Sequence, residues 1–336
     1  MLYGNSPSDF GFLPPQFKGD VQIFLPTGTS ISQWQQWVKP KGTAMVHMIV
    51  VGAGGGGGGG RSGASNTTRG GGGGGGSGGF TSLIMPAMLL PDVLKISVSS
   101  GGTGGLANGS GFAGVASYIS LGAGLTSGSA IPNVILSAAG GNGGNGGTTT
   151  GAGAGGSGVA ATTIASLGPL GRLGFFSNNG TAANAGYPGQ AGSNGGAQTG
   201  TSGVGQSSMW NSSPLTGGSG GAGINTPAQG GFIGGGFSLQ SQVDFADGTL
   251  TPASNFRSGG RSGLATGAAG ESGTTGYKSL KPFLNLGGTG GGSSDSFPGG
   301  AGGVGGYGCG GGGGGAGTTG GRGGDGGPGV VIITSW

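Results

Sequence analysis

Glycine recurs in this chain both in uninterrupted runs and with a period of three residues, and these two patterns constrain the fold more than any other feature. An α-helix repeats every 3.6 residues and a strand every 2, so a period of three favours polyproline II geometry, with three residues per turn and about 3.1 Å rise per residue. The uninterrupted runs are 54–60, 70–76 and 310–315, and the periodic runs are GGNGGNGG (140–147), GGSGGAG (217–223), GGAGGVGGY (299–307) and GGRGGDGGP (320–328).

Helices of this kind are expected to be stable only as a packed array. A single one has no internal hydrogen bonds. Ordering each residue costs about 1–2 kcal/mol, while a backbone hydrogen bond returns about 0.5–1.5 kcal/mol. Nearly every N–H and C=O group must therefore pair with a neighbouring helix. Runs of seven or eight residues span about 22–25 Å, and this similarity in length suits tracts that lie side by side. The non-glycine residue of each repeat is expected to face outward, away from the neighbouring helices.

The rest of the composition narrows the class of protein. Of 336 residues 100 are glycine, only 6% are charged, and the net charge is +4. Because the chain contains no basic run, a nucleic-acid partner is not supported. It shows neither a signal peptide nor an apolar run of 18 residues, so we expect no membrane insertion. The single cysteine, Cys309, is expected to be a small residue within a glycine tract.

The two ends of the glycine-rich part are expected to be paired strands. Residues 44–51 (AMVHMIVV) are apolar on both faces, which predicts a buried strand, and the expected partner lies in 327–336. Residues 20–26 alternate as a strand does. We therefore divide the chain into an N-terminal cap or attachment segment, 1–43, and a glycine-rich domain, 44–336. Further apolar segments that run into glycine are 93–100, 116–124, 133–140 and 282–288.

A family resemblance rests on the two ends of this pattern. The segments WVKPKGTAMVHMIVVGAGGGGGGG (37–60) and GGRGGDGGPGVVIITSW (320–336) resemble the glycine-rich proteins of tailed bacteriophages, including the receptor-binding adhesins at the tips of T-even-type long tail fibres. The resemblance implies a mainly non-helical virion protein, a polyglycine II helix sandwich with a few short β-strands near the termini. It also implies loops that bind a bacterial surface receptor, a protein or a glycan, and an N-terminal segment that contacts other virion proteins.

Carried over to this sequence, the resemblance separates a scaffold from candidate receptor loops. The scaffold would be the glycine runs 54–60, 70–76, 140–147, 299–306 and 310–315, and the loops would be 61–69, 106–132, 177–216 and 237–286. Aromatic residues of the less glycine-dense stretches 157–216 and 224–286 are candidate anchors, since interface hot spots favour aromatic side chains. The candidate receptor-binding residues are Tyr187, Trp210, Phe245 and Phe256. Alternatively, these side chains cover the ends of the glycine array.

Sequence motifs for catalysis or cofactor binding are weak. The match to G-x-G-x-x-G at 52–57 lacks a helix-forming segment after it, and a nucleotide site needs a helix N-terminus there. G-x-S-x-G occurs at 75–79 and 217–221 without the strand and helix of a nucleophile elbow. The single histidine, His47, is expected to pack in a strand, and Asp244 and Asp247 are expected to form a turn. We expect no enzymatic activity, no cofactor and no metal site.

Other functions stay open at this stage. A purely structural capsid, vertex or filament protein would need the same scaffold without receptor binding. An ice-binding protein would need regular outward residues, whereas these are mixed. Only residues 1–43 precede the glycine-rich domain, fewer than in the attachment region of the phage adhesins, so the position on the virion is undetermined. The sequence is compatible with a homo-oligomer.

Overall fold

The computed structural model of the protein describes residues 19–28, 33–122, 134–149, 151–158, 208–210, 215–224, 232–239, 260, 268–280 and 283–336. Over these residues the chain is mainly non-helical, and its one helical element is a 3-10 turn, η2 (Ala87–Leu89). The strands are β1 (Asp20–Phe24), β2 (Gln35–Val38), β3 (Met45–Val51), β4 (Phe80–Pro86), β5 (Val93–Ser97), β6 (Ser117–Ser120), β7 (Val134–Ala138), β8 (Ser208–Trp210), β9 (Phe237–Leu239), β10 (Lys278–Leu280), β11 (Phe283–Asn285) and β12 (Val330–Ser335).

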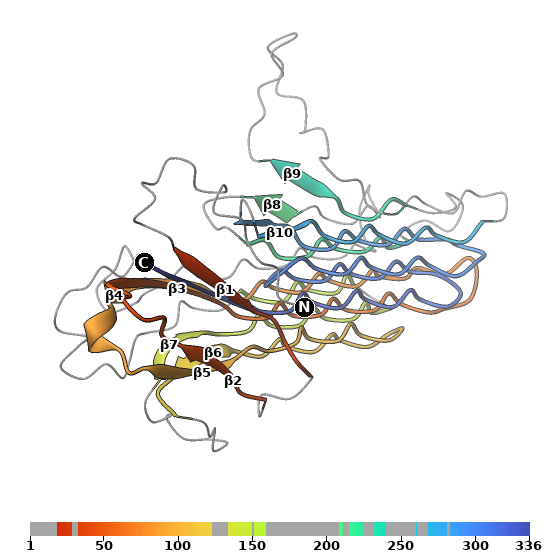
Figure 1. Ribbon diagram of the computed structural model, residues 1–336. Helices are drawn as coiled ribbons and strands as arrows, with labels where there is room; N and C mark the ends of the chain where they lie inside the picture. The colour runs from red at the N-terminus through yellow and green to blue at the C-terminus, as the bar shows by residue number, and fades with distance from the viewer. Residues whose placement is uncertain are drawn as a thin grey trace, which may run out of the picture.

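Two four-stranded antiparallel sheets form one end of the molecule, on the left in Figure 1. The first has the order β1-β12-β3-β4 and the second the order β2-β5-β6-β7. Both sheets contribute side chains to one apolar core, which includes the fully buried Trp37, Met48, Leu94, Ile119 and Ile333. Burial of such side chains stabilises a fold by about 1.5–3 kcal/mol each, so a hydrophobic core stabilises this end of the molecule.

The strand pairing predicted for the two ends of the glycine-rich part is confirmed. β3 pairs antiparallel with β12, with Val51 opposite Val330 and Val46 opposite Ser335. β1 lies along the other side of β12, and β2 pairs with β5 in the second sheet. The described residues of 1–43 are therefore parts of the two sheets, and their role in attachment stays a prediction.

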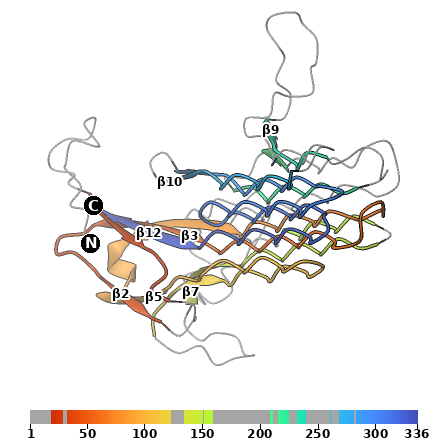
Figure 2. The same ribbon diagram turned by 90° about the vertical axis from the view of Figure 1, so that its right-hand side faces the viewer.

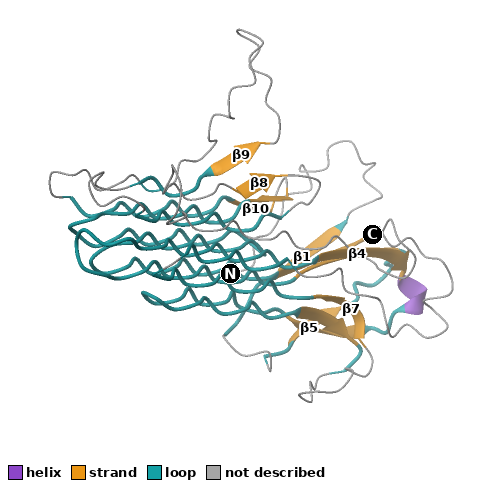
Figure 3. Cartoon of the chain, turned by 180° about the vertical axis from the view of Figure 1, so that it is seen from behind, coloured by secondary structure: helices purple, strands orange, loops and turns teal. Residues whose placement is uncertain are grey.

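Beyond the sheets, the strands continue into glycine tracts that have no regular secondary structure. Figures 1 and 2 show these tracts as coils stacked in layers, and Figure 3 shows how they extend away from the strands. β3 leads into the tract 52–60, which we call the central tract. The tracts that adjoin β4, β5, β6, β7 and β12 are 69–79, 100–108, 109–116, 139–148 and 319–329, respectively.

The central tract donates its backbone hydrogen bonds with a period of three residues. Gly54 donates to Gly327, the next two N–H groups point to two other tracts, and Gly57 donates to Gly324 of the first tract again. The full set of donors and acceptors, each pair 2.8 or 2.9 Å apart, is Gly54 to Gly327, Gly55 to Gly76, Gly56 to Phe112, Gly57 to Gly324, Gly58 to Gly73, Gly59 to Gly109 and Gly60 to Gly321. Acceptor numbers fall as donor numbers rise, so the central tract is antiparallel to these three neighbours.

Carbonyl groups of the central tract accept from three further tracts with the same period. Gly102 donates to Gly54 and Gly105 donates to Gly57, which is a parallel relationship. The remaining bonds run from Gly141, Gly144 and Gly147 to Ala53, Gly56 and Gly59, from Gly311 and Gly314 to Gly55 and Gly58, and from Asn108 to Gly60. Every backbone N–H and C=O from 54 to 60 therefore has a partner, as the energetic argument requires.

The six neighbours of the central tract are also bonded to one another and close a ring around it. The bonds between consecutive neighbours include Gly326 to Gly102, Phe112 to Thr103, Gly111 to Gly144, Gly73 to Asn145, Gly72 to Gly314 and Gly324 to Gly312. The tract 308–317 has a similar environment. It donates to tracts 215–224, 52–60 and 298–307 and accepts from 69–79, 285–295 and 319–329.

Glycine is required in the central tract because its neighbours lie too close for a Cβ atom. A Cβ at Gly57 would overlap the carbonyl oxygen of Gly312, one at Gly58 that of Asn145, and one at Gly59 that of Leu106. These obstacles are backbone atoms held by their own hydrogen bonds, so they cannot move aside as a flexible side chain would. The uninterrupted glycine runs are thus those with neighbours on every side.

The prediction that the non-glycine residue of each repeat faces outward holds for some tracts and is wrong for one. Asn142, Asn145 and Arg322 are exposed. In tract 215–224, however, Ser219 and Ala222 are completely buried. The hydroxyl of Ser219 donates to the carbonyl of Gly236 at 2.7 Å, which shows that a further segment packs on that side. Small side chains are therefore tolerated inside the array where they face another segment.

Part of the less glycine-dense stretch 224–286, which includes the candidate receptor loop 237–286, also belongs to the array. Residues 268–277 (AAGESGTTGY) have glycine only at every third position, 270, 273 and 276. A Cβ at each of these glycines would overlap a carbonyl oxygen of 286–292, whereas the four residues between the glycines are exposed. Only one side of this tract packs closely against other tracts, so only the one residue in three that faces that side must be glycine. One glycine in three is a weaker sequence signal than an uninterrupted run, so the glycine runs alone do not predict this tract.

Candidate functional site

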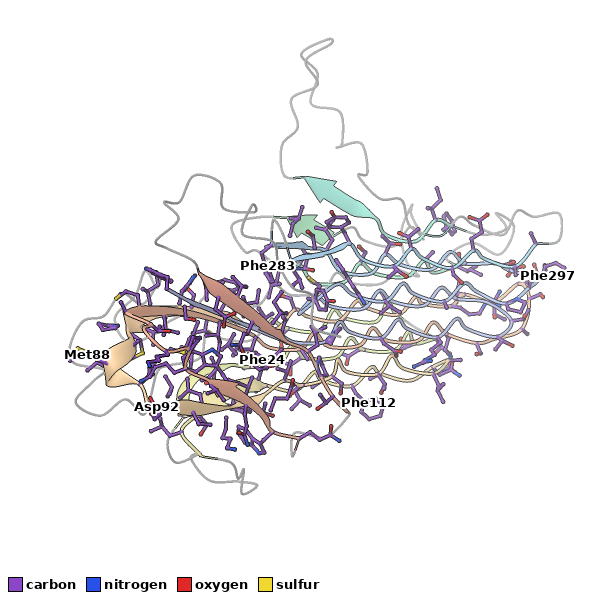
Figure 4. The ribbon with its side chains drawn as sticks, in the orientation of Figure 1. Phe24, Met88, Asp92, Phe112, Phe283 and Phe297 are labelled. Carbon is purple, nitrogen blue, oxygen red and sulfur yellow. The ribbon has the colours of Figure 1, made fainter. Side chains whose placement is uncertain are left out.

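Turns and loops join the glycine tracts at the end of the array away from the sheets, on the right in Figure 4. We call this end the distal end. Its described connections are the loop 61–69, the turns 107–109, 295–298 and 317–319, and residues 148, 149 and 151. Phe297, in one of these turns, is labelled there in Figure 4. Of the candidate receptor loops, 61–69 is the one that lies wholly within the described residues.

Arg69 and Asp295 form a buried ion pair that fixes the loop 61–69 to the turn 295–298. The Nη2 atom of Arg69 lies 2.5 Å from Oδ1 of Asp295, and the two side chains are only 1% and 8% exposed. The guanidinium also donates to the carbonyls of Gly63, Thr67 and Asp295 itself at 2.9, 3.1 and 2.9 Å. Burial lowers the pKa of Arg69, and the charge of Asp295 and its hydrogen bond oppose that shift.

Asn66 completes this cluster at the apex of the loop. Its backbone N–H donates to both carboxylate oxygens of Asp295, at 3.1 and 3.2 Å. Asn66 has a φ of 60°, a left-handed conformation that asparagine adopts more readily than most residues. The carboxylate therefore organises both the cationic side chain and the backbone of the loop.

A second set of polar contacts joins the same loop to two other turns. The N–H of Ser62 donates to Oδ1 of Asn108 at 2.7 Å, and its hydroxyl accepts from the N–H of Gly320 at 2.9 Å. Ser62 and Gly317 form an isolated bridge. Asn108 also has a positive φ, 66°. The loop 61–69 is thus a rigid part of the distal end, held from three sides.

The exposed residues of the distal end are polar and small apart from one aromatic ring. Residues 64–67 (Ala-Ser-Asn-Thr) are exposed, as are Thr148, Thr149 and Ser296. Phe297 is 38% exposed. Arg69 and Asp295 neutralise each other internally, so most groups on this surface are hydroxyl, amide and aromatic groups, which are suited to hydrogen bonding and to stacking. Two charged side chains lie beside them, the partly exposed Arg61 at the start of the loop and the exposed Glu271 next to the turn 295–298.

The candidate receptor-binding residues fall in different parts of the chain. Trp210 lies at the end of β8, which pairs in parallel with β9 so that Trp210 is opposite Leu239. Tyr187, Phe245 and Phe256 lie outside the described residues, and their roles stay predictions. The loop 106–132 was predicted too broadly, because 109–116 is a tract of the array and Ser117–Ser120 is β6. The predicted loop 237–286 is also too broad, because residues 268–277 form a tract of the array.

The motifs that suggested catalysis are buried in the scaffold. No helix follows Gly52–Gly57; the chain continues as the central tract. Ser77 and Ser219, the serines of the two G-x-S-x-G matches, are both completely buried. Among the described residues no group of three or more His, Cys, Asp or Glu side chains is arranged to hold a metal ion. Asp244 and Asp247 lie outside the described residues.

The two remaining reactive side chains have packing roles. His47 lies in β3 between Thr334 and Ile84 on the neighbouring strands, and burial lowers its pKa. Cys309 is completely buried against Val51, Leu215 and Val330. Burial raises the pKa of its thiol to about 12, against the opposing effect of hydrogen bonds from Thr216. Neither residue lies at the distal end.

Comparison with known proteins gives no family for this chain: no protein-family model matches it, and no curated protein matches its sequence. In the part of the chain that the structure describes, no helix has the length and apolarity needed to cross a membrane. The distal end, with the loop 61–69 fixed by Arg69 and Asp295, is the candidate binding surface that the geometry singles out.

Proposed function

We propose that this chain is a bacteriophage virion protein in which a sandwich of polyglycine II helices presents the distal end to a receptor on the host bacterium. In this proposal the glycine tracts are the scaffold, the distal loops contact the receptor, and the N-terminal part at the sheet end contacts other virion proteins. The chain would act by binding, without catalysis. The position on the particle, at a fibre tip, spike or vertex, is left open.

The hydrogen-bond pattern of the central tract is the observation that carries the scaffold part of this proposal. Donors recur every three residues, six neighbours surround the tract, and a Cβ would be blocked in every direction. Threefold periodicity with lateral rather than internal hydrogen bonds is what polyproline II geometry requires of glycine. An α-helix uses its backbone hydrogen bonds internally, and a strand directs them to two neighbouring strands, so neither can bond to six neighbours.

The distal end supports the binding part of the proposal. Binding residues are commonly placed on loops that a rigid scaffold positions. Here the loop 61–69 is held by a buried ion pair and by contacts to two other turns, while residues 64–67 remain exposed. Pre-organising a binding loop lowers the entropy lost on association. A rigid loop with an exposed tip beside Phe297 suits this use.

Binding to host cells tests the receptor part directly. Purified protein is incubated with candidate host strains, and both cell-bound protein and protection from infection by the parent phage are measured. Ser65→Trp and Phe297→Ala alter exposed distal side chains and are expected to weaken cell binding at least about tenfold, the effect of losing a contact worth about 1.4 kcal/mol. The matched control is Met88→Ala, which changes a side chain that is 87% exposed at the sheet end.

The same experiment separates an adhesin from a purely structural virion protein. An adhesin binds cells, blocks infection and loses both properties in the distal variants but not in Met88→Ala. A structural protein is found in purified particles by immunoelectron microscopy but neither binds cells nor blocks infection. Equal loss of cell binding in Met88→Ala and Phe297→Ala would contradict the assignment of the distal end.

A further inference from the structure

One long stretch of the sequence carries no charge at all. Between Lys95 and Arg172 there is no aspartate, glutamate, lysine, arginine or histidine. The described part of this stretch includes β6, β7 and the tracts 100–108, 109–116 and 139–148. These elements form the lower part of the molecule in Figure 1. The side chains of these elements are therefore uncharged, and any charge on this part of the surface comes from other segments.

The outermost tracts of this part expose large apolar side chains. Leu106 is 74% exposed, Phe112 is 66% exposed and Val115 is 38% exposed. Phe112 is labelled at the lower edge of the array in Figure 4. We call the surface of tracts 100–108 and 109–116 the neutral face. Charged groups reach it at Gly104, where Arg322 and Asp325 contact the backbone and pair with each other at 2.6 Å.

The backbone of the neutral face is integrated into the array although its side chains are not covered. Phe112 donates to Thr103 and accepts from Gly56. Leu106 and Phe112 therefore stand on a rigid support, and exposing them gives no advantage to the isolated chain, since burying each would be worth about 1.5–3 kcal/mol. Exposed apolar patches on soluble proteins commonly mark interaction sites.

We propose that the neutral face is the contact surface between two copies of this chain, related by a two-fold axis. The side chains of tracts 100–108 and 109–116 carry no charge, and Arg322 and Asp325 already pair with each other. A charged partner would therefore lose hydration on this face without gaining a new ion pair, so the face favours a partner that is itself neutral and apolar. A second copy supplies such a surface, because a two-fold interface brings the same patch of both subunits together. With only 6% charged residues and a net charge of +4, two copies repel each other little.

The spacing of the side chains also suits self-association. Phe112 and Val115 are three residues apart, as are Thr103 and Leu106, which corresponds to about 9 Å along a tract at 3.1 Å per residue. Two faces with the same spacing can interlock, with the exposed side chains of one copy placed between those of the other. This proposal does not depend on receptor binding, and it is tested separately.

Sedimentation equilibrium of the full chain over a range of concentrations measures the association. The expected result is a reversible dimer whose dissociation constant changes little between about 0.05 M and about 0.5 M salt, because the charged groups that reach the face, Arg322 and Asp325, already pair with each other. The double variant Leu106→Ser/Phe112→Ser is expected to weaken dimerisation at least about tenfold. Serine is suitable at these positions because exposed serines already occur in the array, at Ser110 on the same tract as Phe112 and at Ser157.

The matched control is Met88→Ser, which removes an exposed apolar side chain at the sheet end, and it should dimerise as the parent does. Circular dichroism and thermal melting establish that each variant is folded. A parent chain that is monomeric at every concentration would overturn the proposal. So would a double variant that dimerises as tightly as the parent, or a control that loses dimerisation to the same extent as the double variant.

Discussion

Arg69 and Asp295 are 226 positions apart in the sequence, yet they form a buried ion pair at the distal end of the glycine array. Arg69 is the first residue of the tract 69–79, which returns toward the sheets, and Asp295 is the last residue of the tract 285–295. The pair therefore connects parts of the array that are remote in the chain. Its stability depends on hydrogen bonds from the guanidinium to Gly63 and Thr67 as well as on the charge interaction.

Replacing Arg69 by methionine should destabilise the protein strongly. The change leaves the Asp295 carboxylate buried without its cation, which costs about 3–5 kcal/mol. Arg322→Met is the matched control, because Arg322 forms an ion pair whose side chains are 49% and 43% exposed, and such pairs contribute about 0–1 kcal/mol. Denaturant titration measures the free energy of unfolding of both variants. Equal losses in the two variants would contradict the claim that the distal ion pair stabilises the fold more than an exposed pair does.

A single methyl group in the central tract should be more damaging than the loss of a larger exposed side chain. In Gly57→Ala the new Cβ overlaps the carbonyl of Gly312, and we expect more than about 2 kcal/mol of destabilisation, at the upper part of the range for overpacking. Thr103→Ala, on an exposed position of a neighbouring tract, should change stability by less than about 0.5 kcal/mol. Thermal and denaturant unfolding distinguish the two. A well-tolerated alanine at Gly57 would disprove the close packing described here.

Much of this array could be predicted from sequence, because local chemistry decides it. The apolar runs at β3 and β12 and the glycine periodicity are properties of short segments, and they predict the paired strands and the tracts. The identity of each neighbour is not a local property. Nothing near Gly57 in the sequence indicates Gly312 or Gly324, and nothing in loop 61–69 indicates Asp295.

The buried histidine predicts how stability depends on pH. Burial lowers the pKa of His47 in the folded chain below its ordinary value of about 6.5. Between these two pKa values the unfolded chain binds more protons than the folded one, so stability rises with pH in this window. The folded state is therefore expected to lose stability as the pH falls from about 6.5 toward the folded pKa of His47. Urea titrations from pH 7.5 to 5, in steps of about half a pH unit, measure how the free energy of unfolding changes with pH.

His47→Gln provides the control for that prediction. Glutamine does not titrate, so the variant should lose the part of the pH dependence that lies just below about 6.5. If the free energy of unfolding changes with pH equally in the parent and in the variant throughout this range, His47 is not the source of the pH dependence.

Cys309 should be almost unreactive in the folded protein. With a pKa raised to about 12, the thiolate fraction at pH 8 is about 10⁻⁴, roughly a thousandfold below that of an exposed cysteine. Complete burial of the side chain slows the reaction further. Labelling with a chromogenic disulfide reagent is expected to be slow in buffer and complete within minutes in denaturant. Rapid labelling of the native protein would show that the tract containing Cys309 opens easily.

Other parts of the structure could not be predicted for identifiable reasons. β2 and β4 are not among the strands that the sequence predicts, because β2 has only four residues and β4 begins directly after a glycine tract and ends at Pro86. The tract 268–277 was missed because a single glycine in three is a weak signal. The distal cluster has no sequence signature, since a lone arginine and a lone aspartate in Ser- and Gly-rich loops usually remain in solvent.

Amide hydrogen exchange of the glycine residues tests the central claim most directly. If the lateral hydrogen bonds hold the array together, the amides of residues 54–60 should exchange only through global unfolding and share one protection free energy. The amide of Thr103, which has no partner among the described residues, should exchange much faster. Exchange of residues 54–60 at the rates of an unstructured peptide would contradict the account.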